Sequence, residues 1–152
     1  MKSYYVDLFN YDAWANAKLI ESLKRQEIND DSVLRLLSHL LTAESVWLKR
    51  IKSEKFENAF WDMLSLSECE KLSKECGVSY SSFLNSITDA GLDENISYKN
   101  SSGVLYTNSV GTALRHVSFH SAYHRGQIAK EVRNLNKEPA NTDYITFIRE
   151  QT

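Results

Sequence analysis

Apolar side chains recur every three or four residues along most of the chain, which predicts a protein built mainly of α-helices. The spacing begins near the N-terminus and predicts a first helix over residues 3–26. Its buried face would hold Tyr4, Leu8, Tyr11, Ala15 and Leu19.

Helix-capping residues indicate where the next two helices begin. A second helix would start at Asp31 or Ser32, either of which is a good N-cap before an apolar run. Ser67 is followed three residues later by Glu70, a capping-box pattern that predicts a third helix ending near residue 87.

Residues 88–108 differ from the rest of the chain, because turn-forming residues there separate two short β-type runs, ISYK and VLYT. We expect a small hairpin or an extended loop at this point. Ser109 then caps a fourth long helix that extends through Leu135, and Asp143 begins a short final helix. The pattern as a whole predicts an all-α bundle of four main helices in a single domain, residues 1–152.

The composition narrows the classes of function. A net charge of −2, with no run of like charges, argues against non-specific electrostatic binding to nucleic acid or to an anionic membrane. No apolar stretch reaches the roughly 18 residues of a transmembrane helix, and the N-terminus does not read as a signal peptide. Cys69 and Cys76 would lie about 10 Å apart along one helix, too far for a disulfide. We therefore expect reduced thiols in a cytoplasmic protein.

Three of the four histidines follow one another at four-residue spacing, in the predicted fourth helix. His116, His120 and His124 would project from one side of it, and two histidines four residues apart can bind one metal ion. Spacing alone does not say which pair binds, and buried histidines that only hydrogen-bond would show the same pattern. The segment lacks the glutamate of the HExxH peptidase motif, which excludes that reaction.

His39 can supply the third imidazole that a mononuclear catalytic site usually needs. It lies beside the apolar arc of the second helix, so it would meet the pair if the second and fourth helices are neighbours. Three neutral imidazoles suit zinc, nickel, copper or iron about equally well. The residues therefore predict a divalent transition metal without choosing among these ions.

Four segments, in the same order along the chain, resemble the DinB/YfiT-like family of small metal-binding four-helix bundles. The most specific is HVSFHSAYHRGQ at residues 116–127, which is similar to the HxxxHxxxHRGQ segment of that family. The others are LFNYDAWAN at 8–16, HLLTAESVWLKR at 39–50 and DYITFIRE at 143–150.

The resemblance implies a metal site formed by His39, His120 and His124, with His116 outside the ligand set. It also implies zinc or nickel as the metal, an up-down-down-up topology and a homodimer. Several family members are transferases or isomerases that use bacillithiol, mycothiol or glutathione, so a low-molecular-weight thiol is the expected cosubstrate.

Three functions fit these residues. The first is a metal-dependent enzyme that transfers a thiol to an electrophilic small molecule, and the second is a metal-dependent hydrolase with the same ligands. The third is a non-enzymatic bundle whose metal braces the core. We favour thiol transfer, because we find no unambiguous general base near the histidines, and no catalytic residue is assigned.

Other residues near the motif have both a functional and a structural interpretation. For Arg125 and Gln127 we prefer helix packing and an inter-helix ion pair over contact with substrate or with a ligand histidine. Gly126 predicts the close approach of another helix. Glu44 would be the partner of a buried cation or hydroxyl. We expect core aromatics at Trp14, Trp47 and Trp61.

Overall fold

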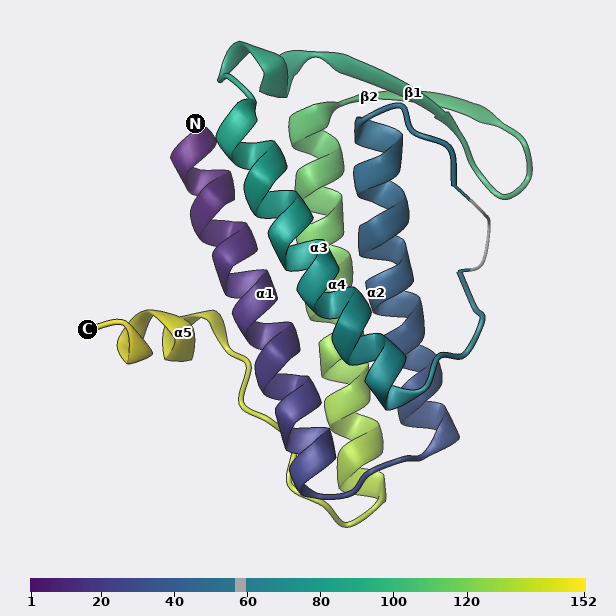
Figure 1. Ribbon diagram of the computed structural model, residues 1–152, viewed down its shortest axis with the longest axis vertical. Coiled ribbons are helices and arrows are strands. Elements are labelled where there is room, and N and C mark those ends of the chain that lie inside the picture. The colour runs from purple at the N-terminus through teal and green to yellow at the C-terminus, as the bar shows by residue number, and fades with distance from the viewer. Residues whose placement is uncertain (57–59) are drawn as a thin grey trace.

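The computed structural model describes residues 1–56 and 60–152, and its architecture is a bundle of four long helices (Figure 1). These are α1 (Lys2–Arg25), α2 (Asp31–Ile51), α3 (Leu66–Ser86) and α4 (Val110–Asn134), followed by the short α5 (Tyr144–Glu150). α2 and α3 begin at the same end of the bundle and run antiparallel to α1 and α4 (Figure 1). The predicted all-α bundle and its up-down-down-up topology are confirmed.

The four helices pack in two main pairs, α1 with α3 and α2 with α4. One apolar cluster fills the end of the bundle where α1 begins and includes Tyr5, Tyr80 and Leu114, whereas a second at the other end includes Leu23 and Leu37. Along α1, α2 and α4 the two clusters are separated by buried polar residues.

The predicted starts of the second, fourth and final helices agree with the structure. Ser109 and Asp143 are the N-caps of α4 and α5. α2 begins at Asp31, although its N-cap is Asp30, whose side chain accepts a hydrogen bond from the backbone N–H of Ser32.

The predicted cap of the third helix is wrong by two residues. Ser65 is the N-cap of α3, and its hydroxyl and the Glu68 carboxylate accept hydrogen bonds from each other's backbone N–H groups. The sequence holds two overlapping Ser-x-x-Glu patterns, so local pattern alone does not choose between Ser65 and Ser67. The earlier start includes Leu66 in the helix, where it packs on an apolar cluster.

The predicted hairpin is present between α3 and α4. After a short 3-10 turn (Ala90–Asp93), β1 (Asn95–Lys99) pairs antiparallel with β2 (Leu105–Ser109). The hairpin lies across the end of the bundle and reaches over α2 (Figure 1), which it contacts through β1. The side chains of the hairpin therefore lie beside α2, on a side that the four helices alone would leave uncovered.

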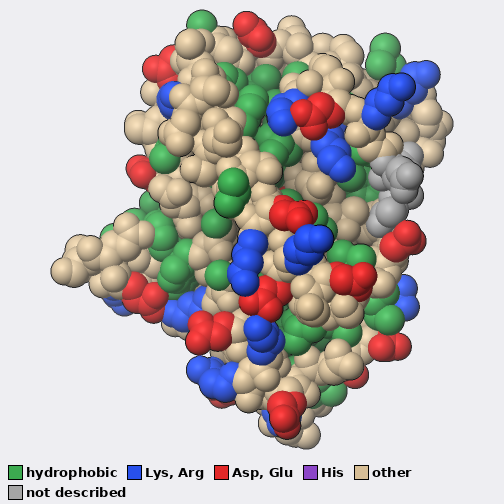
Figure 2. Space-filling view, in the orientation of Figure 1, with side chains coloured by type: hydrophobic (Ala, Val, Ile, Leu, Met, Phe, Trp, Pro, Cys, Tyr) green, Lys and Arg blue, Asp and Glu red, His purple; other side chains and the backbone are tan. Residues whose placement is uncertain are grey.

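The face formed by α1 and α3 carries cationic and anionic side chains interspersed with one another (Figure 2). Among the described residues, no helix combines the length and the apolar character that crossing a bilayer requires.

Candidate metal centre

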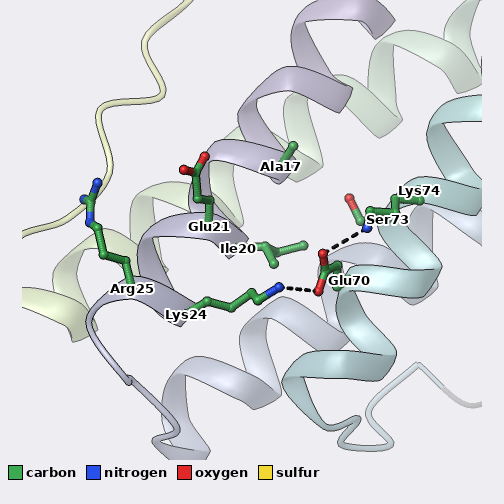
Figure 3. Close-up of a pocket in the computed structure, with 8 residues that line it drawn as sticks. All are labelled: Ala17, Ile20, Glu21, Lys24, Arg25, Glu70, Ser73 and Lys74. Atoms are coloured by element: carbon green, nitrogen blue, oxygen red, sulfur yellow. Dashed lines mark hydrogen bonds and ion pairs between the residues drawn. The ribbon is translucent and has the colours of Figure 1, made fainter.

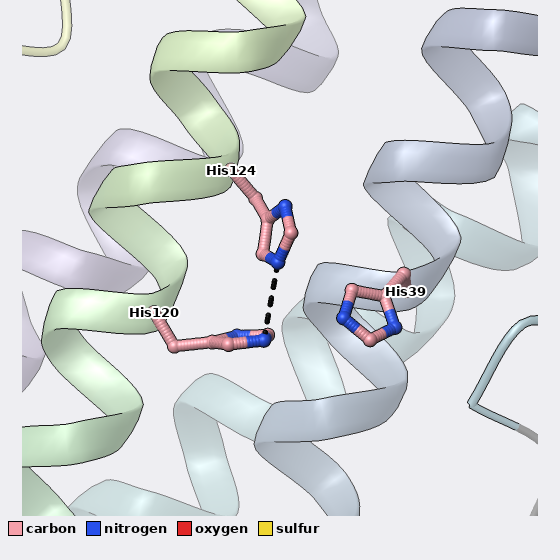
Figure 4. A group of neighbouring side chains, drawn as sticks. All are labelled: His39, His120 and His124. Atoms are coloured by element: carbon pink, nitrogen blue, oxygen red, sulfur yellow. Dashed lines mark hydrogen bonds between the residues drawn. The ribbon is translucent and has the colours of Figure 1, made fainter.

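The structure brings together the three histidines that the family resemblance singles out. His39 projects from α2 toward His120 and His124 on α4, because these two helices are packed against each other (Figure 4). One ring nitrogen from each residue lies within 4.8 Å of the other two. His39 and His124 are buried, and His120 is half-buried.

Two of the rings present nitrogens directly to each other. The Nε2 atoms of His120 and His124 lie 3.1 Å apart, close to the roughly 3.3 Å that separates two nitrogens bound to one tetrahedral zinc ion. Facing nitrogens of this kind must share a proton or bind a common cation. The arrangement therefore fits a divalent ion, and His39, His120 and His124 could hold it.

Hydrogen bonds orient two of the rings for this purpose. The Nδ1 atom of His39 donates to the backbone carbonyl of Phe60 at 2.8 Å, and the Nδ1 atom of His124 donates to the Oε1 atom of Gln127 at 2.7 Å. Because each Nδ1 carries the proton, each Nε2 keeps a lone pair for a metal.

Burial favours the neutral form of the His39 and His120 imidazoles. It lowers the pKa of His39, and burial together with the neighbouring His124 lowers the pKa of His120 to about 3. A neutral imidazole is the form that binds a metal, so no proton need be displaced from these rings at neutral pH.

Gln127 therefore differs from its predicted role in helix packing, since it bonds to a histidine of the cluster. The signal was present in the sequence, because residues three apart on a helix face the same side.

Trp61 also departs from the sequence prediction. It is not a core aromatic, since 56% of its surface is exposed. Its ring lies parallel to that of His39, with centroids 3.7 Å apart, and so covers one face of the imidazole. Trp14 and Trp47 are partly buried against apolar clusters, as predicted. No periodic pattern could have revealed the position of Trp61, because it lies outside the helices.

His116 lies beside the cluster but outside the group that could hold the ion. Its ring packs against Trp47 with centroids 4.9 Å apart, and stands 5.6 Å from that of His120. Cys69 and Cys76 are buried free thiols, and burial raises the pKa of both. The raised pKa values favour the protonated thiol at both positions.

A neighbouring face of α4 contacts a buried polar network. Glu44 on α2 accepts hydrogen bonds from Asn16 at 2.9 Å and from the Ser121 hydroxyl at 2.7 Å. Arg125 donates to Asp12 at 2.7 Å and to Asn16 at 2.8 Å. Arg125 thus forms the predicted inter-helix ion pair, and Glu44 the predicted contact with a hydroxyl.

Gly126 contradicts its prediction. Apart from its chain neighbours and the adjacent backbone of α4 itself, no atom of the described residues lies within 4 Å of the position that a Cβ would take there, so no other helix approaches closely. Nothing in the described structure explains a glycine at this position.

A separate hollow of about 410 Å³ lies between α1 and α3 (Figure 3). Glu70 at its edge bonds to both Lys24 and Lys74, and these bonds lower the pKa of its carboxyl to about 2. The Glu70 carboxylate and the two lysines at this hollow are thus already paired with one another.

The fold and the three-imidazole cluster together define a helical bundle that fits a metal-binding protein. The chain belongs to the DinB family, whose sequence profile matches residues 2–152. It is similar to Protein DinB of Bacillus subtilis (strain 168), with 25% identity over 166 residues that cover 97% of this chain and 95% of that protein. It is also similar to the uncharacterized protein YizA of the same organism, with 26% identity over 134 residues that cover 87% of this chain and 83% of YizA.

Proposed function

We propose that the protein is a metal-dependent enzyme that transfers a low-molecular-weight thiol to an electrophilic small molecule, with zinc or nickel bound by His39, His120 and His124. The observation that carries the proposal is the convergence of three imidazoles beside an open pocket of about 540 Å³ that His39 helps to line. When bound, such an ion lowers the pKa of a thiol or water molecule beside it.

The chain's own residues have an orienting role in this proposal. The Phe60 carbonyl and Gln127 hold two rings with their Nε2 lone pairs inward, and Trp61 limits rotation of the His39 ring. A site prepared in this way binds its ion without reorganising the side chains.

The surroundings of the histidines favour thiol transfer over hydrolysis. Within the described part of the chain, the candidate metal-binding group contains no aspartate or glutamate. Glu44 is engaged by Asn16 and Ser121, and burial raises the pKa of its carboxyl well above the usual range. Hydrolysis commonly uses a base to activate water, whereas a thiolate is itself a nucleophile and needs no further base.

The proposal is tested by mixing zinc- or nickel-loaded protein with glutathione and 1-chloro-2,4-dinitrobenzene. The thiol sulfur forms a bond to the ring carbon, chloride leaves with its bonding electron pair, and the thiol proton passes to the buffer. We expect product above the uncatalysed rate, none without thiol, and none with His120→Ala. A hydrolase would instead cleave p-nitrophenyl acetate without any thiol, and that result would favour the alternative.

We further propose that the enzyme acts as a homodimer in the cytoplasm, on small molecules and without binding nucleic acid or membranes. The weak net charge of −2 supports the last two points. Light scattering on the eluted protein measures the oligomeric state.

A further inference from the structure

The open pocket beside His39 is lined by several aromatic side chains. α2 contributes Trp47 and Arg50, the segment that follows α2 contributes Phe60, and the hairpin contributes Tyr98. At about 540 Å³ the pocket has the size of a small-molecule site. It is therefore aromatic on several sides, with one cation among the rings.

Among the described residues, Arg50 is surrounded by aromatic rings and not by a counter-charge. Its guanidinium carbon lies 4.8 Å from the ring centroid of Trp47 and 5.0 Å from that of Tyr98, with Phe56 and Phe60 at 5.3 and 5.6 Å. Such cation–π contacts orient the guanidinium plane but leave its N–H donors available.

Those donors are poorly used by the described residues. Arg50 donates to the Lys99 carbonyl at 3.2 Å, whereas its buried Nε atom has no hydrogen-bond partner among residues 1–56 and 60–152. No carboxylate in those ranges forms an ion pair with it. Burial lowers the pKa of Arg50, which means that its surroundings disfavour the charge. A bound anion would offset that cost.

A purely structural role accounts for part of this arrangement. Arg50 lies in the last turn of α2, where a cation suits the helix dipole, and its bond to Lys99 ties the hairpin to the helix. That role uses one of five N–H donors and does not require four aromatic rings around an open pocket.

We propose that Arg50 and its aromatic neighbours bind the carboxylate of an elongated, planar small molecule whose reacting end lies at His39. The inference rests on the proposed function, because it identifies one reactant of the thiol transfer. His39 and Arg50 are about three turns apart along α2, on nearly the same side, so the carboxylate is remote from the reacting atom. It belongs either to the electrophile or to the thiol.

Calorimetric binding of biphenyl-4-carboxylate tests the pocket without catalysis. We expect Arg50→Gln to weaken binding about tenfold or more, and the neutral biphenyl-4-carboxamide to bind weakly to both proteins. Arg35→Gln is the matched control, since it removes an exposed arginine from the same helix, and it should leave binding unchanged. Binding should persist, and remain dependent on Arg50, after the metal is stripped with a chelator.

Several results overturn the inference. These are equal binding of the carboxylate and the carboxamide, equal binding by Arg50→Gln and the native protein, absence of binding, and loss of binding when only the metal is removed. The last result would assign the carboxylate to the metal instead. Should Arg50→Gln not fold, Arg50→Lys replaces it, because a lysine lacks the guanidinium fork. A several-fold loss is then expected, and equal affinity overturns the inference.

Steady-state kinetics show whether the carboxylate belongs to the electrophile or to the thiol. They also distinguish failure of the Arg50 proposal from failure of the proposed thiol transfer. KM is compared for 4-chloro-3,5-dinitrobenzoate against 1-chloro-2,4-dinitrobenzene, and for glutathione against its diethyl ester. Arg50→Gln should raise KM for one carboxylated reactant and not for its neutral counterpart, whereas an equal rise for both overturns the inference. Failure of transfer with every pair, while Arg50-dependent binding persists, contradicts the proposed function alone.

Discussion

The two sides of α4 carry polar residues at the same level of the bundle, yet these residues have different surroundings. Toward α2, His120 and His124 present ring nitrogens that face each other, beside a pocket open to solvent. On a neighbouring face of α4, Ser121 and Arg125 are buried. Ser121 bonds to the Glu44 carboxyl on α2, and Arg125 bonds to Asp12 and Asn16 on α1. One side of the helix has unshared lone pairs, and the other has charges that are already paired.

Whether a polar group already has a partner separates a candidate reactive site from a structural network. The two arginines differ in the same way, because Arg125 forms an ion pair with Asp12 at 2.7 Å, whereas Arg50 is surrounded by aromatic rings. Burial of a polar residue therefore does not by itself indicate function. What indicates it is a donor or acceptor directed at a space where a ligand can enter.

The largest expected effect is on the structural side. Asp12→Ala leaves the Arg125 charge buried without its partner and should lower the free energy of unfolding by about 3–5 kcal/mol. Urea denaturation measures it, with the exposed Asp7→Ala on the same helix as control, expected within about 0.5 kcal/mol of the native protein. A loss below about 1 kcal/mol for Asp12→Ala would remove the distinction between the two sides.

On the reactive side, His120→Ala should weaken zinc binding by more than about 100-fold while the metal-free protein keeps its stability within about 1 kcal/mol. Competition with a chelating dye gives the affinity, and urea denaturation gives the stability. His116→Ala is the control and should change affinity only a few-fold. Unfolding of His120→Ala would instead support a metal that braces the core, the non-enzymatic alternative.

Gln127→Ala sharpens the contrast with a smaller effect. Removing the acceptor of the His124 Nδ1 proton should lower zinc affinity about 10- to 100-fold without changing the ligand set. The same dye competition measures it, and Lys130→Ala, an exposed change on α4, serves as control. Unchanged affinity in Gln127→Ala would mean that the hydrogen bond does not orient the ring.

The smallest effect, taken per pH unit, concerns the pH dependence of stability. Burial, and next the nearby Asp12, raise the pKa of the Glu44 carboxyl well above that of an ordinary glutamate. Its contribution to stability is complete below the unfolded pKa and is lost as pH rises through the folded pKa, with a slope of at most about 1.4 kcal/mol per pH unit.

Glu44→Gln has no charge to develop, so it should match the native protein near pH 4 and exceed its stability increasingly as pH rises. Urea denaturation from pH 4 to 9 tests this, with the exposed Glu75→Gln on α3 as control. Parallel pH profiles for Glu44→Gln and the native protein would contradict the raised pKa.

Local sequence was enough to determine the positions of the helices, the hairpin and the spacing of the histidines on α4. It did not give the whole buried face of α1, because Tyr4 was predicted to be buried but is exposed, and Tyr5 is buried instead. Apolar periodicity, N-cap residues and turn residues act within a few positions of one another, so they can be read without knowing the fold. The start of α3 is an exception, because Ser65 and Ser67 offer equivalent local caps. The cap that is used, Ser65, is the one that includes Leu66 in the helix, where it packs on an apolar cluster.

The tertiary structure alone decided what surrounds those histidines. His39 meets His120 and His124 because α2 packs on α4, and Trp61 covers the His39 ring from a segment without periodic pattern. The pocket of Arg50 needs the hairpin to lie over α2. The physical reason is that helix-forming signals are short in range, whereas a ligand site joins side chains that come from distant parts of the chain and meet only after the helices have packed.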